Sequence, residues 1–252
     1  MSSHLVKYAL MAAFRDRLVL ALFLILILGS ALAVFLGSAA VVEKDFFTTV
    51  FTGGILRITG VMGVVLFVVF FVRRAFDSKD VEFLLSRPIG RISFLLSYSL
   101  AFSIMAFFLS LAIGLCIYAV SPHMFSQGHM VWVLSIIVEN IIMVNVALFF
   151  AMYLSSAATA AMCIAAFYVL ARMMGQLLGI IDSSLVPDIG AVSMAVQLIS
   201  VITPRLDLMG QTSWLIYGVD TGFGLFSIMM QGLVFCFLIL LAAMLDFTRR
   251  QF

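Results

Sequence analysis

The sequence predicts an all-α integral membrane protein, a six-transmembrane-helix bundle that forms a single domain over residues 1–252. Hydrophobic residues make up 65% of the chain and charged residues 10%, and the mean hydropathy is +1.25. In a soluble domain about a quarter of the residues are charged. The apolar runs are long and continuous and lack the alternation of a transmembrane β-strand. Because only helices and closed barrels satisfy their backbone groups in lipid, these runs are predicted to be helices.

Length and charge exclude other classes of protein. A transmembrane helix needs about 20 residues, so six spans with their connections use nearly all of the 252 residues, and no nucleotide-binding domain is expected among them. The net charge is only +2 and the basic residues do not form a stripe, so no nucleic-acid partner is expected. Cys116, Cys163 and Cys236 lie inside apolar runs and are expected to be small core residues.

Residues 1–17 have the pattern of an amphipathic helix on the membrane surface. Apolar residues recur at helical spacing between the basic residues Lys7, Arg15 and Arg17. The apolar run that follows, from Leu18 to about Leu36, exceeds the roughly 7–15 residues of a signal-peptide core. A first transmembrane span is therefore predicted, and a cleaved signal peptide is the less favoured alternative.

Five further spans follow, the last two separated by a longer segment, residues 182–222. The apolar stretch from Ala191 to Ile202 within this segment is too short to cross a bilayer, and Pro204 follows it. The segment is expected to be re-entrant or interfacial, on the external side. The predicted spans run from about Val50 to Val72, Ile92 to Val120, Met130 to Leu154, Ala158 to Ile181 and Phe223 to Leu245.

The distribution of basic residues predicts the orientation of the bundle. Ten fall on one side of the six-span arrangement, against Lys44 and Arg205 on the other, and the positive-inside rule places the first side, with both termini, in the cytoplasm. The ten are Lys7, Arg15, Arg17, Arg73, Arg74, Lys79, Arg87, Arg91, Arg249 and Arg250.

The one sizeable connection on the predicted cytoplasmic side is the segment from Arg73 to Arg91 (73–91). Val81, Leu84 and Leu85 form a short apolar face, and Pro88 disfavours helix at the residue before it. The pattern is that of a surface amphipathic helix, which a simple membrane-surface connector would also show.

Residues 82–91 carry a further pattern: an acidic residue, a Leu-Leu pair, Ser-Arg-Pro and another basic residue. In this pattern the chain resembles the permeases of type 2 ABC exporters, in which such a segment follows the second span. The stretch from Thr203 to Leu208 is similar to a Pro-containing stretch that these permeases carry between spans five and six. The resemblance implies that the segment is a coupling helix docked in a groove of an ATPase. The residues implied in ATPase coupling are Glu82, Phe83, Leu84, Leu85, Ser86, Arg87 and Pro88.

The resemblance implies a permease subunit of an ATP-driven exporter in the bacterial inner membrane, paired with a second permease copy or homologue. The sequence contains no Walker A pattern, so ATP and Mg²⁺ are expected in a partner ABC ATPase, with no cofactor and no enzymatic activity in this chain. The alternative is an ATP-independent membrane protein, a secondary carrier or an assembly scaffold. A carrier more often shows matched broken helices, which this sequence lacks.

Three charged residues, Arg57, Glu139 and Arg172, lie inside predicted spans. Each costs about 2.5–3.5 kcal/mol unless it has a partner. All three lie about fourteen or fifteen residues from the predicted cytoplasmic ends, roughly 21–22 Å at the helical rise. We therefore expect an intramembrane charge cluster in which Glu139 pairs with one or both arginines. Three roles stay open: a structural ion pair, a lining of the substrate path, and arginines that reach the outer headgroups.

No residues with the pattern of a catalytic or metal site are found. His123, Met124, His129 and Met130 offer soft ligands of the kind that bind copper. A loop at the membrane surface explains them better, so neither a metal site nor catalytic residues are predicted.

Overall fold

The computed structural model describes residues 3–39, 43–79, 81, 90–181, 190–219 and 225–249, and within these ranges every regular element is a helix. The helices in chain order are α1 (Ser3–Arg15), α2 (Arg17–Ser38), α3 (Lys44–Asp77), α5 (Arg91–Val120), η1 (Pro122–Met124), α6 (Gln127–Tyr153), α7 (Ala157–Ile181), α8 (Gly190–Ile202), η2 (Leu206–Leu208), α9 (Trp214–Tyr217) and α10 (Leu225–Arg249).

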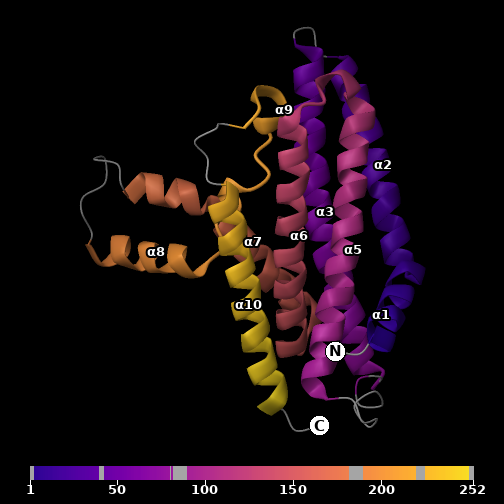
Figure 1. Cartoon of the computed structure of the whole chain (residues 1–252), viewed down its shortest axis with the longest axis vertical. Helices are drawn as coiled ribbons and strands as arrows, with labels where there is room; N and C mark the ends of the chain where they lie inside the picture. Colours follow the sequence, from indigo (N-terminus) through magenta and orange to yellow (C-terminus); the bar gives the residue numbers. More distant parts are fainter. Residues whose placement is uncertain are drawn as a thin grey trace.

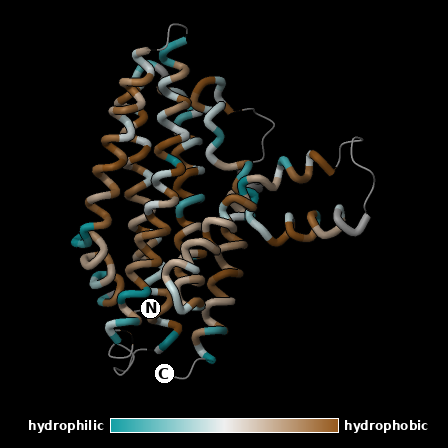
Figure 2. The backbone as a smooth tube through the Cα atoms, turned by 180° about the vertical axis from the view of Figure 1, so that it is seen from behind, coloured by the Kyte–Doolittle hydropathy of each residue, from teal (hydrophilic) through white to brown (hydrophobic). Residues whose placement is uncertain are grey.

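Six of these helices are long and apolar enough to cross a membrane, namely α2, α3, α5, α6, α7 and α10. The predicted all-α class and its six apolar helices are confirmed, and they indicate an integral membrane protein. Hydrophobic residues run along the long helices, whereas hydrophilic residues gather at the end of the bundle that carries both termini (Figure 2).

Helix α3 is much longer than the apolar run that predicted it. Its 34 residues span about 51 Å, against a hydrocarbon layer of about 30 Å. Near its start, the Thr49 hydroxyl lies 2.6 Å from that of Ser121, and near its end Arg73 and Asp77 form an ion pair of 3.1 Å. These polar turns are helical because they bond to neighbours, which hydropathy does not detect.

The predicted N-terminal helix ends two residues early, at Arg15. Asp16 has an extended backbone and its carboxylate accepts a hydrogen bond from the Leu18 amide at 2.9 Å, as an N-cap does. The same carboxylate pairs with Arg74 at 3.2 Å. Asp16 therefore separates α1 from α2 and fixes the bend to the end of α3.

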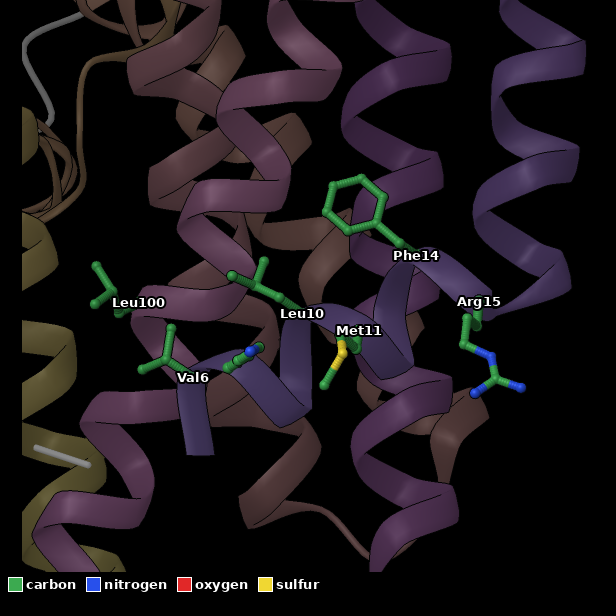
Figure 3. Close-up of a pocket in the computed structure, with 7 residues that line it drawn as sticks. Val6, Leu10, Met11, Phe14, Arg15 and Leu100 are labelled. Atoms are coloured by element: carbon green, nitrogen blue, oxygen red, sulfur yellow. The ribbon is translucent and has the colours of Figure 1, made fainter. Parts of the chain in front are cut away.

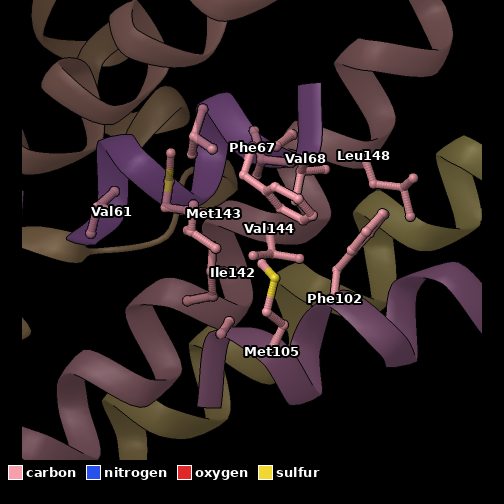
Figure 4. Packing of buried hydrophobic residues seen from close by; sticks show 14 of the residues in the cluster. Val61, Phe67, Val68, Phe102, Met105, Ile142, Met143, Val144 and Leu148 are labelled. Carbon is pink, nitrogen blue, oxygen red and sulfur yellow. The ribbon is translucent and has the colours of Figure 1, made fainter. Parts of the chain in front are cut away.

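The centre of the bundle is formed by α3, α5 and α6 (Figure 1). Their core side chains interlock between the three helices, as Figure 4 shows for Phe67 and Val68 of α3, Phe102 and Met105 of α5, and Leu148 of α6. Phe67 and Phe102 meet edge to face with ring centroids 6.1 Å apart. Since lipid is as apolar as these side chains, close packing rather than burial from water holds such a core together.

Helix α7 leaves the bundle obliquely, and α8 projects to the same side (Figure 1). The prediction that all three cysteines are core residues is wrong for Cys163 of α7, which is exposed. An apolar helix that tilts away from its neighbours turns part of its apolar surface outward, and periodicity alone does not reveal the tilt.

Residues 203–219 of the predicted re-entrant or interfacial segment fold back against the bundle. Leu206, Met209 and Leu215 are buried, with at most 1% of each side chain exposed. Helix α9 lies so close to the start of α6 that a Cβ atom on Gly128 would overlap the Trp214 carbonyl oxygen. Residues 182–189 and 220–222 of the same segment lie outside the described residues.

The close contact between Gly128 of α6 and helix α9 gives a stability prediction. Gly128→Ala should lower the free energy of unfolding by about 1–3 kcal/mol, because the added methyl group meets backbone that cannot rotate away. Gly54→Ala on α3 is the matched control, since a Cβ there has nothing within 4 Å; it should raise stability by up to about 1 kcal/mol through helix propensity. Unfolding by SDS in mixed micelles, followed by circular dichroism, measures the stability of both variants. Equal effects would contradict the close contact of α9 with Gly128.

Candidate functional site

The three charged residues predicted inside the spans come together in the structure. Arg57 of α3 and Glu139 of α6 form an ion pair at 3.0 Å, and Nη1 of Arg172 from α7 lies 3.9 Å from the same carboxylate. The Glu139 side chain has no exposed surface and that of Arg57 only 6%. The predicted pairing of Glu139 with arginine is therefore confirmed, and we call these residues, with Tyr168, the ion-pair cluster.

Arg57 uses all three of its guanidinium nitrogens. Its Nε donates to Oε2 of Glu139 at 3.0 Å and its Nη2 to Oε1 at 3.0 Å, a two-point contact that matches the planes of the two groups. The remaining nitrogen, Nη1, donates to the carbonyl oxygen of Gly210 at 2.7 Å. Arg57 thus joins α3 to α6 and to the chain between η2 and α9.

Two side chains of α7 complete the cluster. The Tyr168 hydroxyl donates to Oε1 of Glu139 at 3.1 Å. Arg172, four residues later on the same face, directs Nη1 to the carbonyl oxygens of Leu206 and of Met209, the latter at 2.7 Å. The Leu206 carbonyl also accepts the Met209 amide at 3.1 Å, so Arg172 adds a second donor there and a donor to the Met209 carbonyl at the end of the short helix η2. Its pairing with Glu139 is secondary.

Gly210 cannot be replaced by another residue without strain. Its φ of +55° lies in the left-handed region, which costs a side chain about 1–2 kcal/mol. A Cβ atom there would also come within 2.8 Å of the Ile136 side chain and 3.2 Å of Arg57 Nε. The Gly210 amide donates to the Ser135 hydroxyl at 2.9 Å. Both backbone groups of this glycine are therefore held by the bundle.

A second ion pair borders the cluster on the side of α7. Arg205 contacts Asp207 through two hydrogen bonds, of 2.8 and 2.9 Å. These bonds raise the pKa of the Arg205 guanidinium. Asp207 lies against α7 at Gly175, where a Cβ atom would overlap its carboxylate. Residues 205–210 are thus attached to α7 by charge and shape together.

The geometry of Arg57 and Glu139 is that of a structural ion pair, one of the three roles that the sequence left open. Arg57 does not reach toward headgroups, because its side chain is almost fully buried and fully bonded. Glu139 has both oxygens occupied and no exposed surface, so it offers no proton acceptor to a substrate. The cluster is built as a tether that holds residues 205–210 against α3, α6 and α7.

Sequence reasoning detected neither Tyr168 nor the backbone carbonyls as partners of the cluster. Tyr168 had a usable signal, since it lies one helical turn before Arg172 and thus faces the same way. The carbonyl of Gly210 had none, because a backbone acceptor has no signature in a sequence.

The other predicted site residues have different outcomes. Residues 82–88, the proposed ATPase-coupling residues, lie outside the described part of the chain. His129 is 3% exposed and its Nδ1 lies 3.3 Å from both the amide nitrogen and the hydroxyl of Ser126, so it caps the start of α6. In the described ranges no group of three or more His, Cys, Asp or Glu side chains is placed to hold a metal ion.

Comparison with protein families and with curated proteins finds no match for this chain. The resemblance to type 2 ABC exporter permeases therefore depends on its short motifs, in residues 82–91 and 203–208.

The cluster predicts unequal couplings between Glu139 and its two arginines. Glu139→Gln and Arg57→Met should each lower the free energy of unfolding by about 2–4 kcal/mol, because the partner charge stays buried and unpaired. The double variant should lose less than the sum, with a coupling above about 1 kcal/mol. The cycle of Glu139→Gln with Arg172→Met should be additive within about 0.5 kcal/mol, since Arg172 bonds mainly to carbonyls. SDS unfolding in micelles measures both cycles, and a larger coupling for Arg172 would refute the assignment.

Proposed function

We propose that this chain is the permease subunit of an ATP-driven exporter of the type 2 ABC kind, and that a separate ATPase drives it. The observation that carries the proposal is the pattern of residues 82–91, an acidic residue, Leu-Leu, Ser-Arg-Pro and a basic residue, between the second and third long helices. Helix α3 ends and α5 begins at the end of the bundle where both termini lie (Figure 1).

Three features support the proposal. The six long apolar helices and the N-terminal helix α1 agree with the architecture that the resemblance implies. The sequence contains no Walker A pattern, so ATP and Mg²⁺ would bind to the partner. Basic residues gather beside residues 82–91 on the same end of the bundle, which the positive-inside rule assigns to the cytoplasm, where ATP is available.

Helix α3 offers a physical route from the ATPase to the membrane. It runs without interruption from Lys44 to Asp77, and Arg57 lies twenty residues, or about 30 Å, before its last residue. A rigid helix moves as a unit, so displacement of the segment after Asp77 would be felt at the ion-pair cluster. A second copy of the chain, or a homologue, would supply the other half of the substrate path.

The first test of the proposal concerns ATP hydrolysis. The purified chain should hydrolyse no ATP, and a protein with a Walker A loop should co-purify with it from native membranes solubilised in mild detergent. Mass spectrometry of the purified complex identifies that protein. An ATP-independent carrier or scaffold would be isolated without an ATPase, and this outcome would refute the proposal.

The second test concerns the segment itself. Leu84→Glu and Leu85→Glu should each reduce recovery of the ATPase at least tenfold, because a buried unpaired carboxylate costs about a few kcal/mol. Thr248→Glu is the matched control: it adds the same charge at an exposed position on the same end of the bundle and should leave recovery unchanged. Membrane insertion is checked by extraction with carbonate. Full recovery of the ATPase with both leucine variants would refute the coupling role of this segment.

A further inference from the structure

An open groove lies between α1 and the first half of α5 (Figure 3). Its volume is about 500 Å³, within the range of roughly 300–1,000 Å³ that is usual for ligand pockets. The apolar part of its lining consists of Val6, Leu10, Met11, Phe14 and Leu100. The aliphatic stems of two cationic residues, Lys7 and Arg15, complete the lining, and their charged ends lie beside it.

The groove exists because α1 uses only one of its apolar faces to contact α5. Val6 and Ala9 are buried against Ala101, with at most 9% exposed. Met11 and Phe14, on the adjoining face, remain 52% and 43% exposed. Apolar side chains in such a position need an apolar occupant.

The two cations of the groove have no neutralising partner on α1. The helix contains no acidic residue, and the acid next in sequence, Asp16, is engaged by Arg74 at 3.2 Å. Neither Lys7 nor Arg15 forms an ion pair or hydrogen bond with another residue in the described ranges. Two positive charges without a partner in the described ranges therefore flank the groove.

The position of the groove matches that of a lipid headgroup and its upper acyl chain. Helix α1 lies beside α5 at the end of the bundle that carries both termini (Figure 1). Leu100 is nine residues into α5, about 14 Å from the start of that helix. This is deeper than the roughly 5–10 Å at which amphipathic surface helices place their apolar face, so the end of the groove at Leu100 lies among the acyl chains. An occupant with an apolar chain and an anionic head would satisfy both parts of the lining.

From the apolar lining, the two free cations and this depth, we infer that the groove between α1 and α5 is a binding site for an anionic phospholipid. An acyl chain lies along Leu10, Phe14 and Leu100, and Lys7 and Arg15, which flank the groove, attract the negatively charged headgroup. The site selects negatively charged lipid, which a purely apolar contact with the surrounding bilayer would not do. The inference depends on the membrane location of the chain and not on the proposed transport function.

Native mass spectrometry of the purified full-length chain tests the selectivity. Phosphatidylglycerol should bind more tightly than phosphatidylcholine with the same acyl chains. Each basic residue contributes about 1 kcal/mol at an anionic surface, or about fivefold in affinity. The double variant Lys7→Gln/Arg15→Gln should therefore lose about 25-fold in affinity for phosphatidylglycerol and none for phosphatidylcholine. Arg249→Gln, an exposed cation at the same end but outside the groove, is the control and should bind as the unaltered chain does.

A fluorescent reporter tests the place of binding. Leu100→Trp puts an indole in the groove, while the two native tryptophans, Trp132 and Trp214, are buried. Phosphatidylglycerol with brominated acyl chains should quench this reporter at lower lipid concentration than brominated phosphatidylcholine does, and millimolar inorganic phosphate should not reverse the quenching.

Three outcomes would overturn the inference. Equal binding of the two lipids would show that charge does not select the occupant. An equal loss in Arg249→Gln would show that only overall charge matters. A reporter that no brominated lipid quenches would show that the groove is covered by protein, such as a second copy of the chain.

Discussion

The ion pair between Arg57 and Glu139 is the interaction on which the arrangement of this bundle depends. An arginine or a glutamate alone in the apolar layer is costly, and the cost falls only when the two groups meet with good geometry and every remaining donor is satisfied. The pair meets through two parallel hydrogen bonds, which fix how the two groups are oriented toward each other. Helices α3 and α6 cannot slide past each other without separating these groups.

The remaining donors of the pair account for the fold of residues 205–210. Nη1 of Arg57 needs an acceptor that no neighbouring span supplies, and the Gly210 carbonyl provides it. That carbonyl is in reach only because Gly210 adopts a positive φ and lacks a side chain next to Ile136 and Arg57. Arg172 then satisfies the carbonyls of Leu206 and Met209. One buried charge pair thus requires a glycine turn, and the turn requires a second arginine.

Most of the membrane-spanning architecture follows from the sequence because a single physical rule governs it. A run of about 20 apolar residues must be helical in lipid, and this rule identified all six long helices. The pairing of Glu139 was predictable for a related reason, since an unpaired acid at that depth is too costly. The oblique course of α7 was not predictable, because hydropathy is the same for a helix that packs and one that tilts into lipid. The tilt also removes the basis of the depth estimate for Arg172, which depended on a helix perpendicular to the membrane.

Burial within the chain indicates which helices can move as one body. We compare the buried share of the most apolar stretch of each helix. This share is 56% in α3 and 61% in α6, but only 22% in α2, 22% in α7 and 28% in α10. Helices α3 and α6 also share the Arg57–Glu139 pair, so separating them would expose two charges to lipid. In a permease of the proposed kind, α3 and α6 would therefore move together, with residues 205–210 attached to them. Helix α7 is tied to the same unit through Tyr168, Arg172 and residues 205–210. Relative motion would therefore be confined to the contacts with α2 and α10, where fewer packed side chains must separate.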